Sequence, residues 1–287
     1  MWASCCRNFI FSILILNLFF RSSSFADEEP KPYHMFTKLP SDLKVWWRET
    51  FRKESLPYVL TLSAASGLLL QTDYETWQIT KVKFDEDKRW RDFMIDTEKF
   101  GGGYFQIGTA LSFMGFGYLF DNKRARRTSF QIAESIFASG ILVQVSKRST
   151  GRESPKSSLE KTGRWRPFPS PQEYAGHVRD YDAVPSGHLS SALTTLVVVQ
   201  ENYPEYKWIP WVGYPLIGLL CLSFSATSIH WWSDYPLGIY LGYHFGKIVT
   251  RNNNETGEIK DEKESNFTFF PTYDEDGTPL LSAVWQF

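Results

Sequence analysis

The chain has 287 residues, of which 22% are charged and 17% aromatic, and its formal net charge is −1. The length allows one domain with its own hydrophobic core, and the balanced charge gives no reason to expect nucleic acid as a partner. The 11 Trp and 14 Tyr residues favour a protein at or in a membrane, because these side chains prefer the boundary between lipid and water.

Residues 1–26 have the layout of a signal peptide. The apolar run Phe9–Phe20 is followed by Ser24 and Ala26, which are small residues at the positions that precede a cut before Asp27. The alternative is an uncleaved anchor, although the run is shorter than the roughly 20 residues that span a bilayer. We therefore expect the protein to be exported.

A polar segment, 27–55, precedes the apolar part of the chain, and within it Ser41–Lys53 has the pattern of an amphipathic helix that lies on a surface or packs like an ordinary helix. Residues 56–250 then contain six apolar blocks, which lack the alternation of strands and mostly have helical lengths. The blocks are Leu56–Gln71, Tyr104–Phe120, Ser129–Val145, His188–Val199, Trp208–Ala226 and Tyr235–Val249. We predict an all-α core, a six-helix bundle.

The lengths of these blocks bear on whether the bundle is embedded in a membrane. Several are at or below the span of roughly 17–25 residues that a bilayer requires. We favour an integral membrane protein over a soluble helical bundle.

The membrane topology is ambiguous. The basic loop Asp121–Arg127 is expected to face the cytoplasm, which places the loop Ser146–Gly187 outside. A cleaved signal followed by six full spans places that second loop inside instead. We give priority to the export signal and expect a membrane-associated protein whose site lies on the extracytoplasmic, periplasmic side.

The last segment, 251–287, begins as a polar tail. Its final part, 266–287, has the pattern of two short strands around the turn Asp274–Gly277. We interpret this part as a β-hairpin appended to the helical core.

Three polar clusters stand at predicted helix boundaries: Lys147–Pro155, Pro185–His188 and Ser223–Asp234. The start of a helix offers free backbone N–H groups and a partial positive charge, so the second cluster is suited to bind an anion. Lys147 and Arg152 are five residues apart and could converge on the same anion.

His230 and Asp234 are four residues apart, so on a helix they share a face. The carboxylate can then keep one imidazole nitrogen protonated and leave the other free to attack. His188 remains as the proton donor to a leaving oxygen, a role commonly worth roughly 100- to 10,000-fold in rate. Together these groups indicate phosphoryl transfer through a phosphohistidine, a chemistry that needs no metal or other cofactor.

The three clusters resemble the motifs of the type 2 phosphatidic acid phosphatase superfamily, which includes bacterial non-specific acid phosphatases and vanadium haloperoxidases. The family pattern is K-x6-R-P, then P-S-G-H, then S-R-x5-H-x3-D, on a helical bundle. The resemblance implies that His188 is the general acid, that His230 is the nucleophile and that Asp234 orients it. The remaining matching positions are Lys147, Pro155, Ser186, Gly187 and Ser223.

Two positions depart from this pattern. Ser154 and Phe224 stand where the first and third motifs have arginines, which grip phosphate in the family. A hydrogen bond to a charged group is worth about 1.5–3 kcal/mol, so the loss of both weakens phosphate binding. We hypothesise that Arg152, together with Arg166, replaces the missing charge, with Arg164 as a further candidate. Lys147, Ser186 and Gly187 complete the predicted phosphate-binding set.

The sequence therefore predicts an exported, membrane-associated phosphatase that cleaves phosphomonoester or diphosphate groups. Lipid-linked substrates are favoured because the site lies at helix ends of an apolar bundle. The alternatives are a non-catalytic lipid-phosphate-binding or scaffold protein of the same fold, and a vanadate-dependent haloperoxidase. The oligomeric state stays open.

Overall fold

The computed structural model describes residues 33–254, 266–273 and 279–286, in two compact units, Met1–Asn254 and Glu255–Phe287. The predicted signal peptide, 1–26, lies outside the described residues.

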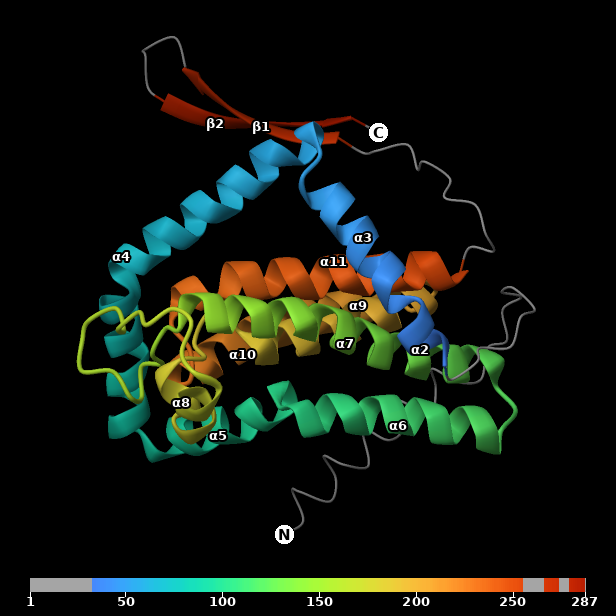
Figure 1. The fold of residues 1–287 in the computed structure, drawn as a ribbon, viewed down its shortest axis with the longest axis horizontal. Helices are drawn as coiled ribbons and strands as arrows, with labels where there is room; N and C mark the ends of the chain where they lie inside the picture. Colours follow the sequence, from blue (N-terminus) through green and yellow to red (C-terminus); the bar gives the residue numbers. More distant parts are fainter. Residues whose placement is uncertain (1–32, 255–265, 274–278, 287) are drawn as a thin grey trace. The chain divides into compact units, whose positions relative to one another are not determined.

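The first unit is helical (Figure 1), and the prediction of an all-α core is confirmed. Its α-helices are α2 His34–Thr37, α3 Leu39–Thr50, α4 Leu56–Glu86, α5 Lys88–Gly101, α6 Gly103–Leu119, α7 Lys123–Thr150, α8 Pro171–Gly176, α9 Gly187–Asn202, α10 Trp208–Ala226 and α11 Tyr235–Asn254. Short 3-10 helices are η1 Lys53–Ser55, η2 Val178–Asp180 and η3 Trp232–Asp234.

The six predicted apolar blocks fall on α4, α6, α7, α9, α10 and α11, but a count of six is too low. The structure adds α5, which packs against α10. Its sequence is rich in charge, and of its side chains only Met94 and Thr97 are buried, so no apolar block marks it. Asp87 separates α4 from α5, because its side chain accepts hydrogen bonds from the backbone N–H groups of Arg89 and Trp90.

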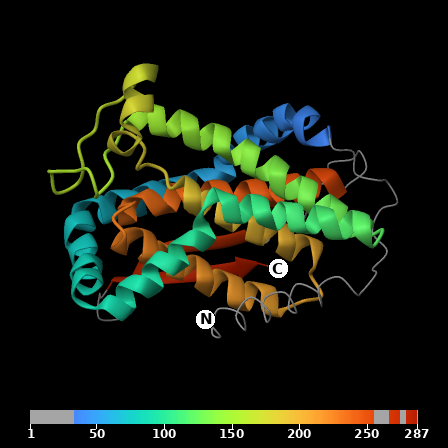
Figure 2. The same ribbon diagram turned by 90° about the horizontal axis from the view of Figure 1, so that it is seen from below.

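Glycines on one face of α11 let it lie directly against α9, beside α7 (Figure 2). A Cβ atom at Gly238 would stand 2.7 Å from the carbonyl oxygen of Ser186, and one at Gly242 would stand 2.5 Å from that of Ser190. Only glycine permits such an approach of two backbones. The contact fixes the chain that enters α9, which carries the second motif.

The hydrophobic core beside this motif is built from α9 and α10. It includes Leu189, Leu193 and Val197 on one helix, and Leu220 and Phe224 on the other. All five side chains are buried, so the C-terminal end of α10 is held rigidly against the N-terminal end of α9.

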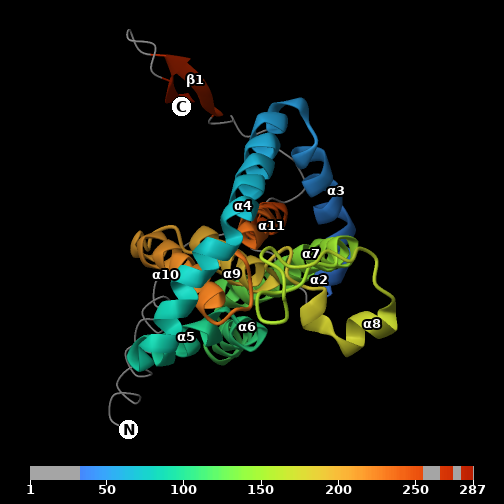
Figure 3. The ribbon, with the colours of Figure 1, turned by 90° about the vertical axis from the view of Figure 1, so that its left-hand side faces the viewer.

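The long connection between α7 and α9 lies at one end of the helices, beside the C-terminal half of α4 (Figures 1 and 3). In the described part of the chain, α10 alone is long and apolar enough to cross a membrane, and 44% of its apolar window is buried inside the protein. Embedding of the whole bundle stays a prediction.

The second unit contains two antiparallel strands, β1 Asn266–Tyr273 and β2 Pro279–Gln286. Asn266 lies opposite Gln286, and Tyr273 lies opposite Pro279. The predicted turn between the strands falls in residues 274–278, which are outside the described part.

Candidate active site

The first motif begins in the last turn of α7. The helix ends at Gly151, whose φ of +52° is the left-handed conformation that glycine adopts most readily. A Cβ atom there would stand 1.8 Å from the carbonyl oxygen of Arg166, so the chain passes closely over the returning loop. This turn sends the rest of the motif across the end of the bundle.

The second motif forms the N-terminus of α9. Ser186 caps the helix, because its Oγ accepts a hydrogen bond of 3.3 Å from the backbone N–H of Leu189. The N–H of Ser186 donates to the backbone carbonyl of Asp234 at 3.0 Å. The second and third motifs are therefore tied to each other directly, and His188 lies in the first helical turn between them.

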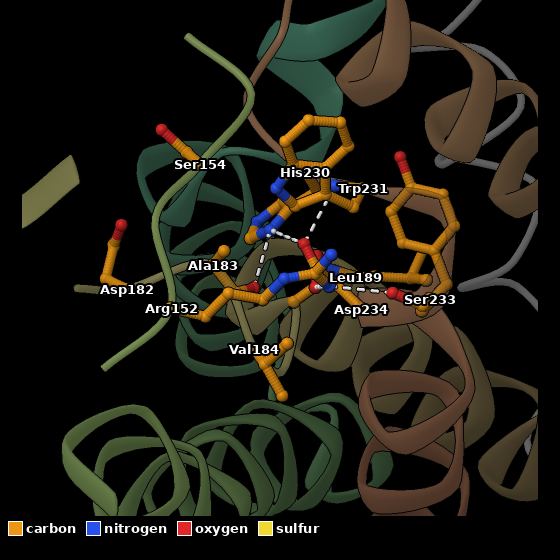
Figure 4. Close-up of polar contacts among 12 residues, drawn as sticks. Arg152, Ser154, Asp182, Ala183, Val184, Leu189, His230, Trp231, Ser233 and Asp234 are labelled. Atoms are coloured by element: carbon orange, nitrogen blue, oxygen red, sulfur yellow. Dashed lines mark hydrogen bonds and ion pairs between the residues drawn. The ribbon is translucent and has the colours of Figure 1, made fainter. Parts of the chain in front are cut away.

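His230 of the third motif is buried, and the partners of its ring decide which nitrogen is reactive. Nδ1 lies 2.9 Å from the carbonyl oxygen of Ala183, and 3.5 Å from Oδ2 of Asp234 (Figure 4). A carbonyl oxygen only accepts, so Nδ1 carries the proton in the neutral ring and Nε2 carries the lone pair. His230 is thus held as a nucleophile through Nε2.

Asp234 contacts His230 without the shared α-helix face that its spacing predicts. Asp234 ends the 3-10 helix η3, and His230 precedes that helix. The carboxylate is oriented by the backbone N–H of Trp231, which donates to Oδ2 at 2.8 Å. Both of its oxygens are therefore held in place, because Arg152 bonds to Oδ1.

The two histidines face each other. Nδ1 of His188 lies 3.4 Å from Nε2 of His230. Burial, followed by the neighbouring His230 ring and the Lys147 ammonium, lowers the pKa of His188 to about 4, and Asp182 opposes this shift. His188 is consequently uncharged at neutral pH in the free protein, and an arriving anion favours its protonated form.

Lys147 lies where the predicted phosphate site requires a cation. Its buried Nζ donates to Oδ2 of Asp182 at 3.2 Å, and a Cβ atom at Gly187 would stand 3.9 Å from the same Nζ. The structure therefore brings together Lys147, Ser186, Gly187 and His188 at the start of α9, as the sequence predicts.

Arg152 is placed differently from what the hypothesis of a substitute phosphate ligand requires. It is fully buried, and all five of its N–H donors are used within the protein. Nη1 donates to Ser233 Oγ and Asp234 Oδ1, Nη2 donates to Asp73 Oδ2 and the carbonyl of Thr162, and Nε donates to the same carbonyl. No donor remains for a ligand.

The other two candidate arginines pair with groups of the connection between α7 and α9. Nη2 of Arg166 donates to Glu153 Oε1 at 2.8 Å and to the carbonyl of Asp180 at 3.1 Å. Arg164 is half exposed and pairs with Glu160. Their charges serve the loop between α7 and α9.

The two departures from the family pattern have different surroundings. Ser154 lines a cavity of about 910 Å³, which His188 also lines. Phe224 is fully buried, and its ring centroid lies 5.4 Å from that of His188 and 6.0 Å from that of His230. Gly101 leaves room for this ring, since a Cβ atom there would stand 2.3 Å from Phe224 Cζ. An apolar wall therefore replaces the third-motif arginine.

The cavity also presents cations that sequence reasoning missed. Lys81, Lys156 and Arg179 line it together with apolar side chains, which include Trp77, Phe84, Ile95 and Ile229. Lys156 follows the first motif directly and could have been noticed there. Lys81 and Arg179 belong to no motif, and only the fold brings them to the site.

Comparisons with known proteins relate the motif-bearing part of the chain to one family. The model of the PAP2 superfamily matches residues 128–257, a stretch that contains all three motifs. Among solved structures, the chain is similar to the first transmembrane PAP2 type phosphatidylglycerolphosphate phosphatase from Bacillus subtilis, with a TM-score of 0.46 and 11% identity, over 80% of this chain and 99% of that chain. No curated protein matches the sequence.

Proposed function

We propose that this chain, which belongs to the PAP2 superfamily through residues 128–257, is a phosphatase that acts through a phosphohistidine on His230. The observation that carries the proposal is the direction of the His230 ring, whose Nδ1–H faces a carbonyl while Nε2 faces His188. A structural histidine does not require that its lone-pair nitrogen face a second imidazole beside a helix N-terminus.

In the proposed reaction, His230 Nε2 attacks phosphorus, and the bond between phosphorus and the leaving oxygen breaks. His188 gives its proton to that oxygen, a step worth about 100- to 10,000-fold in rate. His188 then takes a proton from water, the resulting hydroxide attacks the phosphohistidine, and phosphate leaves. Lys147 and the backbone N–H groups at the start of α9 hold the phosphoryl oxygens.

The cavity supports a phosphate monoester or diphosphate that carries an apolar group. Trp77 and Phe84 provide apolar surface in this space. The cations that line it outnumber the carboxylates: they are Lys81, Lys156 and Arg179, against Glu98 and Asp182. A lipid-linked phosphate has both parts. The apolar helix α10 and the aromatic content of the chain support a membrane-associated protein that meets such a substrate.

The deciding experiment measures phosphate release by the purified full chain. The substrates are a panel of lipid phosphates and diphosphates, together with a water-soluble phosphate monoester. We expect release by the wild type and loss of at least 1,000-fold in His230→Ala, on the order expected when a nucleophile is removed. His244→Ala is the matched control, because the His244 side chain is partly buried and packs on Tyr240 within α11.

Equal release by the wild type and His230→Ala rejects the phosphohistidine. No release by the wild type from any substrate favours the non-catalytic reading of the fold.

We also propose that the protein is exported and that the site faces the extracytoplasmic side. Leu159, in the loop between α7 and α9, is almost fully exposed, whereas Cys221 is buried. In a chain whose Cys5 and Cys6 are replaced by Ser, we expect Leu159→Cys to react in intact cells with a membrane-impermeant maleimide, beside an unlabelled parent that carries the same two replacements. Labelling only after cell lysis reverses the assigned side.

A further inference from the structure

A buried carboxylate on α4 stands behind the candidate site, outside the segment that matches the family. Asp73 is fully buried. Its Oδ1 accepts a hydrogen bond of 3.0 Å from the backbone N–H of Ser233, and its Oδ2 accepts from Ser233 Oγ at 2.5 Å and from Arg152 Nη2 at 2.6 Å. The Asp73 carboxylate is therefore attached to the third motif directly, through Ser233, and also bonds to Arg152.

Arg152 lies between Asp73 and Asp234, with 2.6 Å from a guanidinium nitrogen to each carboxylate. All three side chains have no exposed surface. Two carboxylates and one guanidinium leave the cluster with a net charge of −1. Burial of such a cluster costs desolvation free energy, and a buried ion pair is weak evidence for a purely stabilising role.

The net charge matters for the nucleophile. Asp234 Oδ2 lies 3.5 Å from Nδ1 of His230, so its negative charge favours the positive charge that the ring acquires when Nε2 bonds to phosphorus. Arg152, which bonds to the other oxygen of Asp234, opposes this effect. Asp73 compensates the guanidinium and so leaves the charge of Asp234 available to His230.

We infer that Asp73 is a positioning residue for His230, which acts through Arg152 and Asp234. The inference rests on the proposed phosphohistidine function and deepens it with a residue from α4. Asp73 holds the backbone beside Asp234 through Ser233, and it keeps the buried cluster negative. Neither task involves contact with the substrate.

The experiment compares Asp73→Asn with the wild type in the purified full chain. We expect kcat to fall about 10- to 100-fold, because one supporting partner of an orienting group is lost, while KM stays within about twofold. The amount of phosphohistidine trapped by rapid acid quench with a labelled substrate falls as well. Asp42→Asn is the matched control, since Asp42 is equally buried but bonds to Asn252.

A second variant separates charge from folding. Asp73→Asn combined with Arg152→Met restores the net charge of −1, because both members of one ion pair are removed. We expect this double variant to recover at least part of the kcat that Asp73→Asn loses, with more phosphohistidine trapped. A merely structural role predicts a further loss instead.

The outcomes are distinguishable. Wild-type activity together with an unchanged kcat in Asp73→Asn overturns the inference and leaves the proposed function standing. A folded double variant that is no more active than Asp73→Asn also overturns it. If the single variant does not fold, a folded but inactive double variant overturns the inference in the same way. An inactive wild type rejects the proposed function itself.

Discussion

The helical unit buries two groups of carboxyl side chains and compensates them by different means. At the candidate site, Asp73 and Asp234 share the guanidinium of Arg152. Between α3 and α7, Asp42 and Glu134 bond to each other, and Asn252 also donates to Asp42. Burial, followed by Asp42, raises the pKa of Glu134 to about 9, so a shared proton takes the place of a cation.

The difference teaches what each pair can do. A shared proton neutralises one carboxyl group of the pair and leaves one negative charge on the two groups together, which suits a pair that only connects two helices. At the candidate site the guanidinium of Arg152 bonds to both carboxylates instead, and the carboxylate of Asp234 lies 3.5 Å from His230 Nδ1. The guanidinium therefore lies at the candidate site, where chemistry is proposed, and the shared proton lies in the pair between α3 and α7.

The largest expected effect comes from the removal of Arg152, the cation that lies between Asp73 and Asp234. Arg152→Met leaves Asp73 and Asp234 buried without compensation, and we expect the free energy of unfolding to fall by about 3–5 kcal/mol. Urea unfolding of the full chain measures this loss. A loss below about 1 kcal/mol would show that the two carboxylates need no guanidinium.

The proton shared by Asp42 and Glu134 makes the free energy of unfolding depend on pH. Since the pKa of Glu134 is raised from 4.5 to about 9 on folding, its contribution to stability is complete below about pH 4.5 and is lost as the pH rises through 9. The steepest loss is about 1.4 kcal/mol per pH unit. Glu134→Gln keeps an uncharged group, so we expect a flatter stability curve over this range.

The control for this prediction is the wild type in the same buffers, unfolded at pH 5, 7 and 9. Parallel curves for the wild type and Glu134→Gln would contradict the shared proton.

The comparison also separates a cation that the protein uses internally from one that faces the cavity. Arg179 lines the cavity and is exposed, unlike Arg152. We expect Arg179→Ala to raise KM about tenfold with little change in kcat, because a charge-assisted hydrogen bond to phosphate is worth about 1.5–3 kcal/mol before solvent screening. Lys161→Ala is the control, since Lys161 does not line the cavity. An unchanged KM in Arg179→Ala removes it from phosphate binding.

The last prediction concerns His188. The pKa of His188 is about 4 in the free protein, and the second pKa of a phosphate monoester is about 6. Between these two values the histidine and the substrate together carry the one proton that the reaction needs. We expect kcat/KM to be flat between about pH 4 and 6 and to fall up to tenfold per unit above that range. A maximum above pH 8 would contradict this assignment.

The motif residues could be predicted because they are close in sequence or have fixed spacing. Lys147, Ser186 and His188 surround one helix N-terminus, as expected. The role of Arg152 could not be predicted, because its partner Asp73 lies 79 positions away on α4, two residues beyond an apolar block. Long-range pairs of single charges leave no periodic signal.

The fold shows the same limit. Apolar blocks mark α6, α9 and α10, whose buried and exposed faces are both apolar. They do not mark α5, whose exposed side chains alternate between charged and apolar, nor the polar C-terminal half of α4 that carries Asp73. Tertiary contacts with α10 and η3 hold these two segments as helices.

The direct contact between His188 and His230 has a consequence for the choice of substrate. A phosphoryl group between them needs roughly 3–3.5 Å for attack and about 2.6–3.2 Å for proton donation, whereas His188 Nδ1 and His230 Nε2 stand only 3.4 Å apart. On this mechanism, binding of the substrate has to move the imidazole rings of His188 and His230 apart. A small soluble phosphate makes few contacts and brings little binding free energy for that separation. An apolar chain that binds in the cavity, away from the phosphorus, provides more. Chain length should then govern kcat as well as KM.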